Sequence, residues 1–268
     1  MVGLKTLAEM LEERAPLSTQ ESWDNSGWQI RLENYENTGI SKVLVALELN
    51  PAVAEEAIRE KVQLIVCHHP LIFGGVRAVD HNEFTGNMII KLVQAGISVY
   101  ATHTPFDKCE GGNNDELARL LGLMDVQSIP GDDSGICRMG KLNTPAPVKD
   151  VLRAYASATG QDIRCYRIIG DGERQAESVG ICTGAGAEFL DLAAAAGCDL
   201  FVTGDVKYHT AHHALELGIS VADLGHYGSE QIFTANMAGL LRKGLEAAGE
   251  NAEILESQVC LNPFAAVE

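Results

Sequence analysis

The chain has 268 residues, of which 46% are hydrophobic and 21% charged, a balance typical of a folded globular protein with one large or two smaller α/β units. Twenty basic residues against 37 acidic ones give a formal net charge of −17. A surface this acidic would repel a phosphate backbone, which argues against general nucleic-acid binding. A small anionic substrate is not excluded, because bound metal ions dominate the electric field inside their site.

Cysteine usage and the N-terminal segment indicate the compartment. The seven cysteines are odd in number and include no C-x-x-C pair, so neither a zinc ribbon nor a thioredoxin-type motif is expected. Cys67 points back into an apolar strand and is expected to be buried rather than a metal ligand. Residues 1–17 form an amphipathic helical pattern without the features of a signal peptide, and no run reaches membrane-spanning length. We therefore expect a cytoplasmic protein with reduced thiols and no membrane association.

Short apolar runs with strand character alternate with helical patterns along the chain. In the first half the predicted strands are 43–49, 64–68 and 98–102, and the predicted helices are 51–60 and 82–96. In the second half the predicted strands are 178–183, 199–204 and 220–225, and the predicted helices are 188–197 and 206–218. This alternation predicts an α/β fold of two lobes, each with a mostly parallel or mixed sheet flanked by helices.

The division into lobes is predicted from composition. Residues 125–150 are rich in Gly, Pro, Asp and Ser, as connections are. We expect residues 1–128 plus 226–268 to form a first lobe and residues 129–225 to form a second. Gly-Ile-Ser-Val at 96–99 recurs at 218–221, and each copy runs into a histidine-bearing loop, which favours a loose, decayed duplication relating the lobes.

Polar residues follow four predicted strands, at the edge where open α/β folds build their sites. The four segments are CHHPLIFGG (67–75), THTPFD (102–107), TGDVKYH (203–209) and GHYGSE (225–230). Adjacent His68 and His69 can both turn into one cleft once their strand has ended. If a helix begins near residue 226, His226 and Glu230 share one face at i and i+4, a spacing that lets two side chains hold one ion.

Histidine combined with carboxylate suits Zn, Fe, Mn or Ni better than Mg or Ca. The candidate ligands are His68, His69, Asp107, His226 and Glu230. Five ligands exceed the needs of one structural zinc, whereas two ions about 3.5–4 Å apart and bridged by Glu230 would use them all. We therefore predict two divalent metal ions per chain, carried by the first lobe. The pattern does not assign His68 and His69 to particular ions, and a strand-end histidine can also be an ordinary hydrogen-bonded residue.

Other polar residues in these segments have two interpretations. His103 is interpreted as a residue that supports the ligands rather than as a ligand. Asp205, Lys207 and His209 are candidates for contact with a substrate, the lysine as an anion contact, although Asp205 fits equally well as a helix cap. The loop 184–186 would suit a phosphate, but it lacks the third glycine of a dinucleotide fingerprint, which favours a tight turn.

The four segments together resemble one family. CHHPLIFGG, ATHTPFDKCEGGNNDELARLLGL (101–123), TGDVKYH and GHYGSE are similar to the Ngg-one-interacting-factor-three-like family, also described as type 2 homologs of GTP cyclohydrolase I. WDNSGW (23–28) resembles its N-terminal signature, although Trp28 stands where an aliphatic residue is expected, and ICTGAG (181–186) resembles its second-lobe glycine loop. The resemblance covers nearly the whole chain and indicates the compact form, without the domain that some bacterial members insert. It implies two lobes, a dinuclear metal centre on the five candidate ligands, and a homohexameric ring.

Two functions remain as hypotheses. The first is a metal-dependent hydrolase acting on a small molecule, in which two ions lower the pKa of a water and polarise the scissile bond. The family label suggests GTP, with water opening the imidazole ring of the purine, and no catalytic side chain is assigned. The alternative is a non-catalytic metal-storage, metal-delivery or regulatory scaffold. Ligands at loop tips, rather than a closed cysteine set, favour an open and reactive site.

Overall fold

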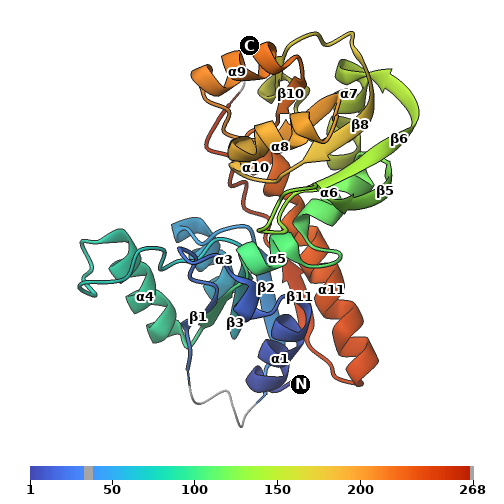
Figure 1. The fold of residues 1–268 in the computed structure, drawn as a ribbon. Coiled ribbons are helices and arrows are strands. Elements are labelled where there is room, and N and C mark those ends of the chain that lie inside the picture. Colours follow the sequence, from blue (N-terminus) through green and yellow to red (C-terminus); the bar gives the residue numbers. More distant parts are fainter. Residues whose placement is uncertain (33–38, 266–268) are drawn as a thin grey trace. The chain divides into compact units, whose positions relative to one another are not determined.

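The computed structural model describes residues 1–32 and 39–265 and divides the chain into two compact units. Unit 1 comprises Met1–Cys109 and Phe233–Leu261, and unit 2 comprises Glu110–Ile232 and Asn262–Glu268. Each unit is a mixed β-sheet flanked by helices, so the predicted α/β class is confirmed (Figure 1). Across the described ranges, no helix combines the length and the apolar character that crossing a membrane requires.

Five strands form the sheet of unit 1, in the order β1-β4-β3-β2-β11. They are β1 (Gly27–Ile30), β2 (Lys42–Ala46), β3 (Leu64–Cys67), β4 (Ser98–Ala101) and β11 (Glu253–Glu256). Strands β4, β3, β2 and β11 run parallel, and β1 pairs antiparallel with β4. Because β3 and β4 are parallel neighbours, the polar segments that follow them begin at the same edge of the sheet.

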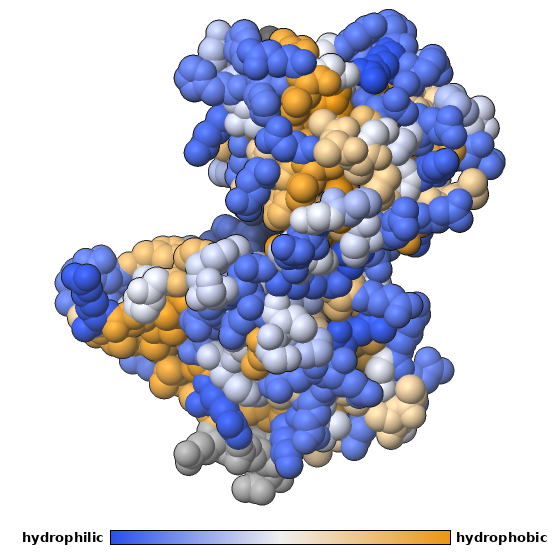
Figure 2. Space-filling model, viewed as in Figure 1, coloured by the Kyte–Doolittle hydropathy of each residue, from blue (hydrophilic) through white to orange (hydrophobic). Residues whose placement is uncertain are grey.

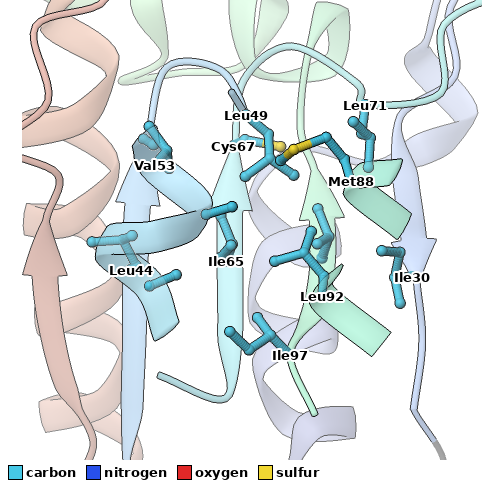
Figure 3. Packing of buried hydrophobic residues seen from close by; sticks show 14 of the residues in the cluster. Ile30, Leu44, Leu49, Val53, Ile65, Cys67, Leu71, Met88, Leu92 and Ile97 are labelled. Atoms are coloured by element: carbon cyan, nitrogen blue, oxygen red, sulfur yellow. The ribbon is translucent and has the colours of Figure 1, made fainter. Parts of the chain in front are cut away.

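Helices cover the sheet of unit 1. They are α1 (Leu4–Arg14), α3 (Pro51–Glu60), α4 (Phe84–Ala95), α5 (Thr104–Lys108) and α11 (Ile232–Ala248). Figure 3 shows α3 and α4 against one face, where Val53 and Leu92 pack with Leu44 and Ile65 of β2 and β3. All four side chains are buried, and burying one aliphatic side chain of this size stabilises the fold by roughly 1.5–3 kcal/mol. Helix α3 begins where predicted because Asn50 Oδ1 accepts a hydrogen bond from the Val53 amide at 2.9 Å.

Six strands form the sheet of unit 2, in the order β5-β6-β8-β9-β10-β7. The strands are β5 (Leu123–Ser128), β6 (Arg138–Pro147), β7 (Arg167–Ile169), β8 (Gln175–Ile181), β9 (Leu200–Thr203) and β10 (Ser220–Asp223). The helices are α6 (Asn113–Leu120), α7 (Val148–Thr159), α8 (Leu190–Ala195), α9 (Tyr208–Leu217) and α10 (His226–Glu230). Strands β8, β9 and β10 are parallel, and the other pairs are antiparallel.

The central strand β9 contributes to a hydrophobic core on each face of this sheet. Leu200 and Val202 join the core that contains Tyr155 of α7, whereas Phe201, between them, joins the core that contains Ala193 of α8 and Ala214 of α9. Side chains alternate between the two faces of a strand, so this pattern places helices on both faces. Strands β9 and β10 are consequently buried along their whole length.

The unit boundaries differ from the predicted lobes, which were residues 1–128 plus 226–268 and residues 129–225. Residues 33–38 and 266–268 of these lobes lie outside the described residues. Strand β5 pairs antiparallel with β6, so the chain enters unit 2 at Glu110, and the Gly- and Pro-rich stretch after Ser128 is a loop within that unit. Helix α10 also belongs to unit 2, where Tyr155 Oη and Gln161 Nε2 both donate to the Gly228 carbonyl at 3.0 and 2.8 Å. The candidate ligands are therefore divided between the two units rather than carried by one.

The repeated Gly-Ile-Ser-Val segment has the same local structure in both units. Gly96 ends α4 and Gly218 ends α9, each in the left-handed conformation at φ +72°, which glycine adopts without strain. The residues that follow lead directly into β4 and β10. The repeat thus marks one type of helix-to-strand turn, and the duplication stays a prediction.

Candidate metal-binding residues

Three histidines of unit 1 lie together at the carboxyl edge of its sheet. His68 and His69 follow β3, and His103 follows β4 and precedes α5. One ring nitrogen from each histidine lies within 4.8 Å of the other two, so the three side chains could hold a metal ion. Asp107 is also buried here, with Oδ1 3.6 Å from His68 Nε2. The structure thus brings His68, His69 and Asp107 together, while their role as ligands stays a prediction.

Hydrogen bonds fix the rings of the two adjacent histidines. The His68 Nδ1–H donates to the Thr102 carbonyl at 2.9 Å, and His69 Nδ1 lies 3.5 Å from Glu48 Oε2. An oxygen acceptor at Nδ1 places the proton on that nitrogen, so Nε2 carries the lone pair that a metal ion needs. Metal-binding histidines commonly have this arrangement.

His103 is held by a buried carboxylate. Its Nδ1–H donates to Asp24 Oδ1 at 2.9 Å, and the same carboxylate accepts hydrogen bonds from the hydroxyls of Ser26 and Thr104 at 2.8 and 2.6 Å. Burial raises the pKa of Asp24, but these hydrogen bonds and the charge interaction with His103 outweigh it and hold that pKa well below its usual value. His103 was predicted only to support the ligands; its nitrogen lies among the candidate ligand atoms, so we treat it as a further candidate ligand.

A second pair of candidate ligands lies in unit 2. Helix α10 begins at His226, so His226 and Glu230 share one face, with 3.1 Å between Nε2 and Oε2. Glu230 is 3% exposed. The His226 Nδ1–H donates to Asp205 Oδ2 at 2.8 Å, which directs Nε2 to the carboxylate of Glu230. The i, i+4 geometry expected from the sequence is present.

Asp205 is therefore a partner of His226 and not a helix cap. Its backbone has a φ of +55°, which is costly for a residue other than glycine, and strain of this kind concentrates at functional sites. The N-cap position of α9 belongs to Lys207, and no side-chain hydrogen bond caps that helix. Lys207 and His209 are exposed at the start of α9, and among the described residues neither belongs to a group of candidate ligand atoms.

The glycine loop of unit 2 packs against Glu230. Gly184 has a φ of +67°, and a Cβ at this position would lie 2.3 Å from Glu230 Oε1. The Gly184 amide donates to Ser229 Oγ at 2.9 Å, and the Gly186 amide donates to Thr203 Oγ1 at 3.1 Å. These amides are used within the fold, which supports the tight-turn interpretation over a phosphate-binding loop.

The donor chemistry fits a divalent transition metal or zinc. Imidazole nitrogens and carboxylate oxygens are the ligands that Zn, Fe, Mn and Ni accept. Burial raises the pKa of the Cys67 thiol to about 12, and among the described residues Cys67 belongs to no group of candidate ligand atoms. The candidate set therefore consists of histidine and carboxylate alone.

Two carboxylates that hydrogen-bond to the histidine rings were not predicted from the sequence. Glu48 lies in a predicted strand where every other residue from 43 to 49 is apolar, and a lone charge at such a strand end was a usable signal. Asp24 lies in the WDNSGW segment, which was singled out for its family resemblance and is also rich in hydrogen-bonding side chains. Each reaches its histidine from a distant part of the chain.

Residues 2–263 match the model of the Duf34/NIF3 (NGG1p interacting factor 3) family. The chain belongs to this family. This Duf34/NIF3 member is 29% identical to the GTP cyclohydrolase 1 type 2 homolog of Clostridium acetobutylicum, with 97% of each chain covered. It is 33% identical to the protein of the same name from Streptococcus pneumoniae, over 84% of this chain and 86% of the relative. A solved structure of a hypothetical protein from Staphylococcus aureus has a TM-score of 0.88 at 27% identity, with 97% of this chain and 98% of that chain covered.

Proposed function

We propose that the chain is a metal-dependent hydrolase that holds two divalent metal ions on its candidate ligands. The unit 1 half-site comprises His68, His69, His103 and Asp107, and the unit 2 half-site comprises His226 and Glu230. One observation carries the proposal. Oxygen acceptors at Nδ1 hold the rings of His68, His103 and His226. The Nε2 atoms of His68 and His226 are then directed to the carboxylates of Asp107 and Glu230. Such support behind the ligating side chain is typical of functional metal sites.

The number of donors supports two ions over one. Four imidazoles and two carboxylates exceed the four ligands of a closed structural zinc site. Glu230 suits the bridging position because a carboxylate has two acceptor oxygens, whereas an imidazole held at Nδ1 offers one nitrogen. Two bound divalent ions would supply a water of lowered pKa and a polarised scissile bond. The chain's own contribution is to hold the rings of His103 and His226 through Asp24 and Asp205.

The substrate class is proposed from the relatives. Two of them carry the name GTP cyclohydrolase 1 type 2 homolog, so we propose GTP as the first compound to test, with hydrolytic opening of its purine imidazole ring. A centre of two cations would attract a small anion despite the net charge of −17. Exposed Lys207, at the start of α9, is proposed as a contact for the anionic part of the substrate.

The test is turnover by the metal-loaded protein with GTP and a panel of phosphorylated metabolites. Wild type is compared with Glu230→Gln, and with Glu216→Gln as a control, because the Glu216 side chain is 79% exposed in the same unit. We expect wild type and control to turn over one compound equally, and Glu230→Gln to be slower by at least about 100-fold. Full metal occupancy without turnover of any compound would contradict the hydrolase and favour a non-catalytic metal scaffold.

We also propose that the chain assembles as a homohexameric ring. Figure 2 shows apolar surface over α4 and the loop before it, where Val76, Val79, Phe84 and Val93 are exposed. A cluster of exposed apolar side chains is a common mark of a protein–protein interface. We expect light scattering at micromolar concentration to give the mass of six chains of 28.7 kDa each. A single-chain mass for the metal-loaded protein would contradict the assembly.

A further inference from the structure

Two large aromatic side chains of unit 1 are exposed side by side. Trp23 is 55% exposed and Phe73 is 54% exposed, and their ring centroids lie 6.0 Å apart at an interplanar angle of 47°. Aromatic residues make up only 6% of the chain, and many of the others are buried in the cores. Large rings dominate the energetics of binding sites, so an adjacent exposed pair needs an explanation.

Hydrogen bonds hold the backbone on which both rings are mounted. The Asp24 amide, next to Trp23, donates to the Glu21 carbonyl at 3.0 Å, and the Asp24 carboxylate accepts from the hydroxyls of Ser26 and Thr104. Ile72, next to Phe73, is fixed twice: the Asn25 side-chain amide donates to its carbonyl at 2.6 Å, and its own amide donates to Gln29 Oε1 at 3.0 Å. The segments that carry Trp23 and Phe73 are thus tied to each other and to the strand edge. A ligand would bind to rings already in place, which lowers the entropic cost of binding.

Both rings contact His103 of the unit 1 half-site. The His103 centroid lies 5.7 Å from that of Trp23 and 6.1 Å from that of Phe73, and both contacts are edge-on. His103 also lies 5.0 Å from the ring of His68 and 5.6 Å from the ring of His69. One continuous set of ring contacts therefore leads from the exposed pair to the candidate metal ligands.

We propose that Trp23 and Phe73 form a stacking subsite for the planar heteroaromatic ring of the substrate. The role of this subsite in a reaction rests on the proposed function. The binding of a ring can be measured without turnover. A ring stacked on the exposed pair would lie near His103, which both side chains contact. Stacking on aromatic side chains tolerates different bases, so the subsite selects for a planar ring rather than for one nucleobase.

The chain has two tryptophans, so Trp28→Phe leaves Trp23 as the only indole fluorophore. We titrate this metal-loaded variant with guanosine 5′-monophosphate and with ribose 5-phosphate, which lacks the ring. The expected result is quenching of Trp23 by the nucleotide alone. Adding Phe73→Leu should raise the nucleotide Kd about tenfold at unchanged metal content, because one stacking face is lost. Phe264→Leu, which removes a 73% exposed ring elsewhere, should leave the Kd unchanged.

Equal quenching by the two compounds would overturn the proposed subsite. An unchanged nucleotide Kd after Phe73→Leu would also overturn it. Trp23→Leu in the otherwise wild-type chain gives an independent check by calorimetry. If it splits the assembly in light scattering and leaves nucleotide affinity unchanged, the aromatic pair is an interface between chains and the proposal is wrong. Ring binding without turnover of any compound would support the subsite and count against the hydrolase, so the two failures are distinguishable.

Discussion

Glu230→Ala is expected to lower the bound metal at both positions of the proposed centre, whereas His226→Ala should empty mainly one. Glu230 is buried, and its Oε2 lies 3.1 Å from His226 Nε2, so it can ligate the ion that His226 holds. Its second oxygen makes it the bridging ligand that we propose, whereas the imidazole of His226 has one nitrogen left once Nδ1 donates to Asp205. Losing the bridge therefore removes a ligand from two ions at once.

Elemental analysis of the purified proteins measures this difference directly. Glu216→Ala is the control, since the same change at an exposed position of unit 2 should leave the metal content at the wild-type level. Two ions at full occupancy in Glu230→Ala would show that the bridging role is wrong. Equal losses in Glu230→Ala and His226→Ala would also contradict the distinction between a bridging and a terminal ligand.

Gly184→Ala is expected to weaken metal binding although it removes no ligand. The new Cβ would lie 2.3 Å from Glu230 Oε1 and 3.4 Å from His226 Cε1, so the Glu230 carboxylate must move. Gly197→Ala is a matched control, because Gly197 also has a left-handed φ, of +77°, but a Cβ there meets nothing within 4 Å. Both changes cost about 1–2 kcal/mol of backbone strain, and only the first displaces a candidate ligand.

Thermal unfolding and metal titration separate these two effects. We expect both variants to lose stability through backbone strain, and Gly184→Ala alone to lose metal affinity, by about 10–100-fold. Identical metal affinities in the two variants would mean that the position of Glu230 does not determine binding.

Local sequence signals predicted helices and strands, and also the clustering of candidate ligands within each unit. The helix predicted over 51–60 is α3 because Asn50 caps it and Pro51 suits its first turn. The histidines after β3 and β4 were expected at one edge because parallel strands end together, and they lie there. The shared face of His226 and Glu230 could also be predicted, because an i, i+4 arrangement depends on a single helical turn.

Contacts between residues far apart in the sequence could not be predicted from the sequence. The role of His103 follows from Asp24, which is 79 residues away, and the ring of His226 is set by Asp205, 21 residues away. The compact units differ from the predicted lobes because a Gly- and Pro-rich loop looks the same within a unit as between units. Only the pairing of β5 with β6 shows to which unit residues 123–128 belong.

Anomalous scattering from crystals of the metal-loaded wild type tests most directly whether the candidate ligands hold two metal ions. Data collected on both sides of the metal absorption edge locate the ions without reference to activity. We expect two peaks per chain about 3.5–4 Å apart, next to the candidate ligands. A single peak, or peaks away from the candidate ligands, would contradict the proposed dinuclear centre.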